Sequence, residues 1–264
     1  MTGTAAPGAL IDTHCHLDVA AFDGDRDAVV ARAAAAGVAG IVVPAIRPRT
    51  WDALRALARR YAGDGVRAAF GVHPQIVPEL DGDELAGDLT ARLVEAARDA
   101  CAIGECGLDG GTPAHELQEQ IFRAHIRAAR ATGKPLVIHV LRAHHAAPRI
   151  LRDEGPVAGV LHSYSGGPEL VPVYRDLGLA FSFAGPVTYG RARRPIAAAR
   201  AVPAELLLAE TDAPDQAPEP HRGGRSEPAF VAAVVGGLAT ARGASASEIA
   251  ALTTANACRM FGAW

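Results

Sequence analysis

Near its N-terminus the chain reads LIDTHCH over residues 10–16, a short apolar run that ends in two histidines. The run predicts a β-strand over residues 9–13, and side chains two apart in a strand point to the same side. His14 and His16 are therefore expected to face one metal ion, while Thr13 and Cys15 point away. Asp12 lies on the same face, and we expect it to support a ligand imidazole rather than bind the metal itself.

Seven further apolar runs of strand length follow, separated by stretches with helical patterning. Near-continuous hydrophobic strands that alternate with helices indicate a parallel sheet covered by helices. The expected strands span residues 9–13, 40–45, 68–72, 102–105, 136–140, 159–162, 179–183 and 206–210. The expected helices span residues 25–36, 51–61, 84–100, 115–131, 144–153, 167–177, 191–201, 227–242 and 247–260.

This alternation over 264 residues favours the α/β fold of a single (β/α)8 TIM-type barrel. The barrel domain is expected to span residues 9–264, after a short N-terminal tail at residues 1–8. The alternative is an open doubly wound sheet, which requires a glycine-rich phosphate-binding fingerprint after an early strand. No such fingerprint follows the first expected strand, so we favour the barrel.

Six side chains that can bind metal lie at or next to the C-terminal ends of five expected strands. Because the parallel strands of a barrel deliver these ends to one mouth, where the active sites of this fold lie, the sequence predicts a metal site there. The candidate ligands are His14, His16, Glu105, His139, His162 and Asp212. Another histidine, His73, ends the third expected strand.

The formal net charge of −3 and the pI near 6.4 argue against a protein whose whole surface binds polyanions. Lys134 is the single lysine among 26 basic residues. Arginine suits bidentate phosphate contacts, but genomic base composition is the simpler explanation of the excess, and we favour it. Arg191, Arg193 and Arg194 follow the seventh strand on the mouth side and either steer polyanions or form a solvated helix start.

The four cysteines show no CxxC pair and no dense spacing, which predicts reduced thiols in a cytoplasmic protein. Cys106, beside Glu105, is expected to pack in the core rather than act as a nucleophile. No signal peptide is recognisable at the N-terminus, and no apolar run approaches the roughly 20 residues of a membrane span. We therefore expect a soluble protein with no membrane contact and no obligate protein partner.

Six motifs occur in order along the chain, and together they are far more specific than any one alone. The chain resembles the TatD family of metal-dependent hydrolases, a branch of the amidohydrolase-like TIM barrels, from Ile11 to Phe261. The motifs are Asp-x-His-x-His at Asp12, Gly-x-His-Pro at Gly71, Gly-Glu-x-Gly-Leu-Asp at Gly104, Pro-x-x-Ile-His at Pro135, His-Ser-aromatic-Ser-Gly at His162 and Glu-Thr-Asp-Ala-Pro at Glu210.

The resemblance implies a site for two divalent ions, either Mg²⁺, Mn²⁺ or Zn²⁺. It places His14, His16 and Asp212 on one ion and His139 and His162 on the other, with Glu105 bridging. Two such ions can clamp the attacking and leaving oxygens of a phosphodiester and generate a metal-bound hydroxide.

Two groups of side chains are expected to serve the reaction itself. Glu105 and Asp212 would be catalytic, and Asp212 would orient the attacking water or accept its proton. His73, Arg142 and Tyr164 are the nearest candidates for contacts to the phosphate oxygens.

The leading function is then a phosphoesterase, most specifically a TatD-like 3′–5′ exonuclease acting on single-stranded DNA ends, with RNA as a further substrate. The first alternative is a metal-dependent ester hydrolase such as an aminoacyl-tRNA deacylase, which the same hydroxide could support. The second is a non-catalytic metal-binding scaffold, against which the intact ligand set argues. The sequence does not separate the two hydrolases.

The chain departs from the family pattern at three places. The arginine usually two residues after the histidine of the fifth strand is replaced by Leu141, and Arg142 follows. The glutamine of a Phe-x-x-Gln helix motif is His125, and Gly110-Gly111 stands where aromatic residues follow Gly-Leu-Asp.

The remaining polar residues near the site receive structural roles. Asp109 is expected to tie down the loop after the fourth strand. The other histidines are expected at the surface or at helix caps, two of them close enough to the fifth strand to touch a substrate. They are His115, His125, His144, His145 and His221.

Overall fold

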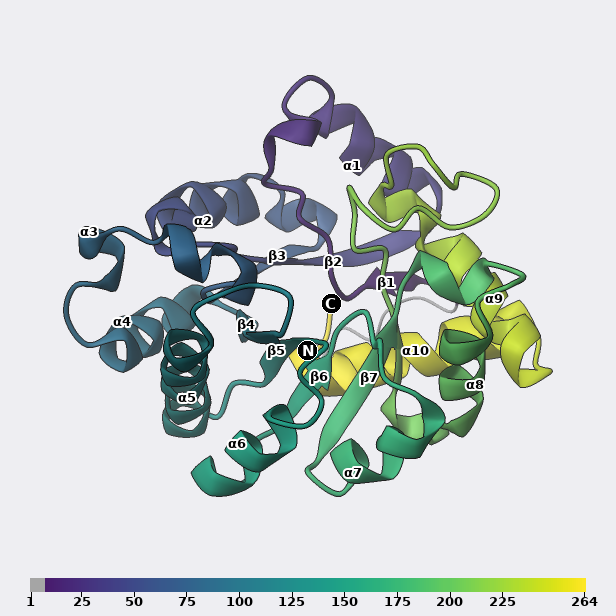
Figure 1. The fold of residues 1–264 in the computed structure, drawn as a ribbon. Coiled ribbons are helices and arrows are strands. Elements are labelled where there is room, and N and C mark those ends of the chain that lie inside the picture. Colours follow the sequence, from purple (N-terminus) through teal and green to yellow (C-terminus); the bar gives the residue numbers. More distant parts are fainter. Residues whose placement is uncertain (1–7) are drawn as a thin grey trace.

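The computed structural model describes residues 8–264, so the tail expected over residues 1–8 lies outside the described residues apart from Gly8. Eight parallel strands follow one another around the sheet in sequence order, which confirms the α/β barrel (Figure 1). The strands are β1 Leu10–Asp12, β2 Val38–Pro44, β3 Val66–Phe70, β4 Ala102–Asp109, β5 Leu136–Leu141, β6 Gly159–Leu161, β7 Leu179–Phe183 and β8 Leu207–Ala209.

Backbone hydrogen bonds between the segments that follow β1 and β8 nearly close the barrel. Thr13 N donates to the Ala209 carbonyl at 3.2 Å, and His16 N donates to the Ala213 carbonyl at 2.7 Å. Asp212 N donates in return to the His14 carbonyl at 2.9 Å. The first and last segments that carry predicted ligands are therefore fixed to each other by their main chains.

The interior of the barrel is filled at its N-terminal end. Each strand contributes one buried apolar side chain to this layer, as expected for a barrel with a packed core. These residues are Ile11, Val42, Ala69, Ala102, Val137, Val160, Ala180 and Leu208. Ala257 and Phe261 of α10 (Ala246–Phe261) pack against them, and Figure 1 shows this helix crossing the barrel. Only the opposite, C-terminal end is left for a polar site.

The outer helices agree with the predicted pattern except in their boundaries and at residues 84–100, where two helices replace one. They are α1 Arg26–Ala35, α2 Trp51–Arg60, α3 Gly82–Leu85, α4 Leu89–Ala96, α5 His115–Thr132, α6 Ala147–Glu154, α7 Val171–Arg175, α8 Arg193–Ala201 and α9 Val231–Arg242. Within residues 8–264 no single helix is long and apolar enough to cross a membrane, although Pro228–Arg242 and Ala246–Phe261, bent by 110°, pass that test of length and composition as a pair.

The single helix predicted over residues 84–100 was wrong. Gly87, with φ of +74°, separates α3 from α4. Asp88 then begins α4, because its carboxylate accepts hydrogen bonds from the backbone N–H groups of Thr90 and Ala91 at 2.8 and 3.3 Å. A left-handed residue followed by a capping carboxylate ends one helix and starts the next.

The expectation that His125 lies at the surface was also wrong. His125 is fully buried on the inner face of α5. Its Nε2 accepts a hydrogen bond from Val72 N at 3.0 Å, and its Nδ1 lies 2.7 Å from the Ile121 carbonyl, to which it donates. Burial lowers the pKa of His125 to about 4, so the ring is neutral and links α5 to the segment that carries His73.

Candidate metal centre

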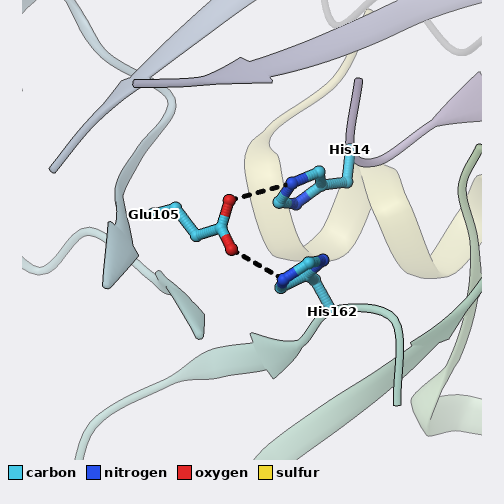
Figure 2. Close-up of side chains that lie close together, drawn as sticks. All are labelled: His14, Glu105 and His162. Carbon is cyan, nitrogen blue, oxygen red and sulfur yellow. Dashed lines mark ion pairs between the residues drawn. The ribbon is translucent and has the colours of Figure 1, made fainter. Parts of the chain in front are cut away.

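Glu105 faces a cluster of histidines at the mouth of the barrel. The side chain is fully buried, and each of its two oxygens points to a different imidazole, that of His14 or that of His162 (Figure 2). Oε2 lies 3.1 Å from His14 Nε2, whereas Oε1 lies 2.7 Å from His162 Nε2. His73 Nε2 and His139 Nδ1 also approach Oε1, at 2.9 and 3.1 Å. One carboxylate therefore contacts histidines of β5 and of the segments that follow β1, β3 and β6.

The imidazoles form two close pairs. His14 Nε2 and His16 Nε2 lie 3.2 Å apart, and His139 Nδ1 and His162 Nε2 lie 3.1 Å apart. Two nitrogens bound to one tetrahedral ion at about 2.1 Å are about 3.4 Å from each other, so each pair has the spacing of ligands that share an ion.

Asp212 completes the group around the first pair. Its Oδ1 lies 3.6 Å from His14 Nε2 and 3.9 Å from His16 Nε2. The structure thus brings all six predicted ligand residues together, in overlapping clusters of His14, His16 and Asp212, of His14, Glu105 and His162, and of His73, Glu105 and His139. The division into two ion sites that the resemblance implies stays a prediction.

The residues present fit divalent cations. Among the described residues, Glu105 Oε2 is buried and accepts no hydrogen bond, although His14 Nε2 is close to it. A buried carboxylate oxygen without a partner is costly, and a cation between Glu105 and the histidines would remove that cost. Imidazole and carboxylate are ligands that Zn²⁺ and Mn²⁺ accept, and carboxylates also suit Mg²⁺.

Glu105 and His16 carry the charges that metal binding requires. Burial alone would raise the pKa of Glu105, but His162, His73 and His14 outweigh it and hold this pKa well below the usual value. Burial, together with His14, lowers the pKa of His16 to about 3. At neutral pH Glu105 is therefore ionised and His16 is neutral, which are the forms that bind metal.

Asp212 differs from Glu105 in its proton affinity. Burial raises the pKa of Asp212 to about 6, although His162 and His14 act in the opposite direction. A carboxylate with this pKa is mostly ionised at neutral pH and still takes up a proton more readily than an exposed aspartate does.

Asp12 supports the main chain rather than an imidazole. Its Oδ1 accepts from Thr211 N at 2.9 Å and from His14 N at 3.3 Å, and its Oδ2 accepts from Thr211 Oγ1 at 2.6 Å. The supporting role was predicted, but the expected contact with a ligand ring was wrong. Asp12 instead joins the ends of β1 and β8, where His14 and Asp212 follow.

The role of Glu210 was missed in the sequence. This buried carboxylate accepts a hydrogen bond from Ser163 N, and its Oε1 lies 3.5 Å from His162 Nδ1. The contact orients the imidazole from the side opposite Glu105. A signal was available, because Glu210 lies two residues before Asp212 in the same motif.

Gln216 was also missed, and no pattern in the sequence marks it. Its Nε2 donates to Asp212 Oδ2 and to Ser163 Oγ, the latter at 2.7 Å. Gln216, Asp212 and Ser163 all have positive φ values, of 50°, 55° and 40°. Left-handed backbone at non-glycine residues gathers at functional sites, where the surrounding contacts maintain it.

A cavity of about 520 Å³ opens in front of these side chains. Four of the six candidate ligands line it, together with His73, which was predicted to contact the substrate. Gln75, another lining residue, donates from Nε2 to Asp109 Oδ2 at 2.7 Å. Asp109 Oδ1 accepts from Gly111 N at 2.7 Å, so Asp109 ties down the loop after β4 as predicted.

Two predicted substrate contacts lie elsewhere. Tyr164 is buried, its hydroxyl donates to the Gly167 carbonyl at 3.0 Å, and its ring packs edge-on against Phe181. Arg142 is exposed and lines a neighbouring cavity rather than the one at the metal centre. The structure therefore does not bring Tyr164 or Arg142 together with the ligand cluster.

The other predicted roles can be placed as well. Cys106 is buried, its thiol donates to the Val137 carbonyl at 3.4 Å, and burial raises its pKa, which fits the predicted packing role. His144 is half-buried between Tyr174 and Ser165. The arginines at the start of α8 are exposed, and Arg194 lies 3.5 Å from Glu169.

The chain is similar to known proteins over almost its whole length. The family model described as TatD related DNase matches residues 11–262. An uncharacterized metal-dependent hydrolase of Bacillus subtilis, YabD, is 34% identical over 96% of this chain and 98% of its own. A protein of Pantoea ananatis named 3′-5′ ssDNA/RNA exonuclease TatD is 32% identical over 96% of this chain and 99% of its own.

A solved structure gives the same result for the fold. The crystal structure of YjjV, a TatD homologue from Escherichia coli, superposes with a TM-score of 0.88. It is 31% identical in sequence, and the match covers 97% of this chain and 98% of that one. The similarity therefore spans the whole barrel, including every strand that carries a candidate ligand.

Proposed function

The chain belongs to the TatD family of metal-dependent hydrolases, and we propose that it is a phosphoesterase that removes nucleotides from the 3′ end of single-stranded DNA. The observation that carries the proposal is Glu105, whose two oxygens contact different imidazoles, that of His14 at 3.1 Å and that of His162 at 2.7 Å. A carboxylate in this position can bridge two ions. The relative from Pantoea ananatis supports the choice of substrate through its name.

The chain would hold one ion with His14, His16 and Asp212 and the other with His139 and His162, with Glu105 between them. Bound there, two divalent ions supply Lewis acidity for the phosphoester and lower the pKa of a coordinated water. The side chains of Asp212 and His73 make the remaining contributions. Asp212 would accept the proton of the attacking water, and His73 would orient the substrate.

Asp212 is the group best suited to accept the proton of the attacking water. Its pKa of about 6 lies near neutral pH, which is where a general base works best. Gln216 donates to Oδ2 of Asp212, while Oδ1 faces His14. The carboxylate is thereby held in one orientation before the substrate arrives.

His73 is placed to bind the phosphate. It lines the cavity, and its Nε2 lies 2.9 Å from Glu105 Oε1. Its Nδ1 accepts from Gln75 N at 3.0 Å, which puts the ring proton on Nε2, the nitrogen that faces the site. In the structure this N–H points to Glu105 Oε1, and we expect it to turn to a phosphate oxygen once a cation engages Glu105.

The proposal is tested with metal-free protein and two labelled substrates, single-stranded DNA and aminoacyl-tRNA. With Mg²⁺ or Mn²⁺ restored, we expect the DNA label to shorten stepwise from the 3′ end and the aminoacyl ester to survive. Chelation should abolish the reaction. Cleavage of the ester alone would replace the proposal with a deacylase, and inactivity toward both would favour a non-catalytic metal-binding protein.

We keep the cytoplasmic location as part of the proposal. The four cysteines carry free thiols, which agrees with a reducing compartment. Fractionation of cells that produce the protein tests the location, with one marker protein for the cytoplasm and one for the space outside it. The protein should appear with the cytoplasmic marker.

A further inference from the structure

Beside the metal centre lies a second cavity of about 200 Å³, which we call the Arg142 pocket. Arg142, His115, His145, Asp109, Glu119 and Gly110 are among its lining residues. The two cavities share a wall at the ends of β4 and β5. Leu141 lines the metal cavity and Arg142 lines the pocket, while Asp109 Oδ2 lies 3.7 Å from His139 Nε2.

The side chains that give the Arg142 pocket its positive charge are free to bind a ligand. In the part of the chain that the structure describes, the side chains of Arg142, His115 and His145 make no hydrogen bond and no ion pair, and Arg142 and both histidines are exposed. One permanent cation and two imidazoles thus face a small concave space. Such groups bind an anion without first breaking a contact within the protein.

The two carboxylates of the pocket are already engaged. Glu119 accepts from Arg123 Nη2 and from Arg149 Nη2, both at 2.8 Å. Asp109 accepts from Gly111 N and from the Gln75 side chain, both at 2.7 Å, so it is held against its own loop. Neither carboxylate neutralises Arg142.

The unusual glycine pair explains why the pocket exists. A Cβ on Gly110 would lie 2.5 Å from the Arg142 carbonyl, so a side chain there would force the end of β5 to move. A Cβ on Gly111 would lie 3.5 Å from Arg142 Nη1, which places the guanidinium directly beside this glycine. Any larger side chain at Gly111 would compete with a ligand for that guanidinium.

The loop after β4, which lines the pocket, is held in place before any ligand binds. Gln118 of α5 is buried and accepts from Asp109 N at 2.9 Å. Its Nε2 donates to the carbonyls of Thr112 and Pro113, both at 3.0 Å. A ligand would therefore meet a preformed wall and would not have to order it.

We propose that the Arg142 pocket binds the phosphate of the nucleotide next to the one being cleaved. This inference rests on the proposed nuclease function, and it gives the substrate a second anchoring point outside the metal centre. Arg142 would act in binding, through its guanidinium fork, and the imidazoles of His115 and His145 would add hydrogen bonds. Substrates with a single phosphodiester would not reach the pocket.

The test compares two substrates, the p-nitrophenyl ester of thymidine 5′-monophosphate and a short oligothymidylate. We expect Arg142→Asn to lower the ratio of kcat/KM for the oligonucleotide to kcat/KM for the ester by roughly tenfold. Asparagine is chosen because it tolerates the φ of +53° at this position. Arg142→Lys keeps the charge but loses the guanidinium fork, so its ratio should lie between those of the parent protein and Arg142→Asn.

Binding is measured separately with metal-free protein in a chelator, using a fluorescent oligothymidylate at several salt concentrations. Arg142→Asn should weaken binding and reduce the slope of log K against log salt by about 0.7, the loss of one phosphate contact to a single strand. Arg152→Asn is the matched control, because Arg152 is an exposed arginine of α6 that lines a different cavity. It should change neither quantity.

Each outcome decides something. An unchanged ratio and unchanged binding in Arg142→Asn would overturn the pocket while the nuclease function stands. Equal losses on both substrates would also overturn it, because Arg142 would then act at the cleaved phosphate. Binding that depends on Arg142 in a protein that cleaves no oligonucleotide would support the pocket and overturn the nuclease function.

Discussion

Glu105 is the residue whose loss should affect both halves of the metal centre. Because its two oxygens contact different imidazoles, we expect Glu105→Ala to lose most of the metal from both positions. His162→Ala should mainly empty one. Elemental analysis of protein reconstituted with Mn²⁺ or Zn²⁺ measures the difference, and equal losses in the two variants would argue against a bridging carboxylate.

Gln216 tests the idea that Asp212 must be held in place. Gln216→Leu removes the donor to Asp212 Oδ2 and the link to Ser163. Loss of a side chain that orients a ligand typically costs roughly 10–100-fold in metal affinity or activity, and we expect a fall in that range.

Metal affinity by calorimetry and kcat at saturating metal are the two measurements for Gln216→Leu. Ser163→Ala is the companion variant, since it removes one partner of Gln216 and keeps the contact with Asp212. It should lower metal affinity and kcat less than Gln216→Leu does. A Gln216→Leu protein that binds metal and turns over like the parent would show that the contact has no functional role.

Glu105 and Gln216 also differ in how well their roles could be predicted from the sequence. Glu105 could be predicted, because a carboxylate at a strand end within a recognisable motif has few other uses. Gln216 could not, because its position depends on the path of the Pro-rich loop after β8, which no periodicity describes. Arg142 was predicted only in part. Its place at the end of β5 was predicted, but the cavity that it faces was not.

At the scale of elements, the contact between α5 and the segment after β3 carries a pH dependence. His125 is neutral in the folded protein with a pKa of about 4, against about 6.5 in an unfolded chain. Between these values only the unfolded state takes up the proton, so stability falls as the pH drops from about 6.5 toward 4. The full effect of this one group is about 3 kcal/mol.

His125→Gln should remove this dependence and keep the contact, because a glutamine amide can accept from Val72 N without titrating. Urea unfolding of metal-free protein from pH 7 to pH 4.5 compares the two chains. We expect similar stability at pH 7 and a smaller acid loss in the variant. Parallel curves would mean that His125 is not the titrating group.

The element boundaries show why periodicity alone was incomplete. All eight strands could be predicted, because buried parallel strands are nearly continuous apolar runs. His125 could also have been recognised as buried, since it lies three residues after Phe122 and four before Ala129 on the apolar face of α5. The break between α3 and α4 was harder to predict, because Gly87 and Asp88 are common within helical patterns.

At the scale of the molecule, the metal centre joins parts of the barrel that are far apart in the sequence. His14 and Asp212 follow the first and last strands, whose ends are linked by a few backbone hydrogen bonds and by the side chains of Asp12 and Thr13. Glu105, His139 and His162 connect the same centre to β4, β5 and β6. Ions bound here would therefore cross-link the barrel where it closes, as well as serve the reaction.

This arrangement predicts that metal binding stabilises the whole fold. An ion present at a hundredfold excess over its Kd adds about 2.7 kcal/mol, because it binds the folded state and not the unfolded one. For a domain of this size we expect Tm to rise by roughly 5–10 °C when Mn²⁺ or Zn²⁺ is added to metal-free protein. Differential scanning calorimetry measures the shift, and Glu105→Ala is the control, in which most of it should disappear. A parent protein whose Tm is the same with metal and with chelator would show that the ions contribute nothing to closing the barrel, and the pairing of β1 with β8 would then rest on the main chain and on the side chains of Asp12 and Thr13.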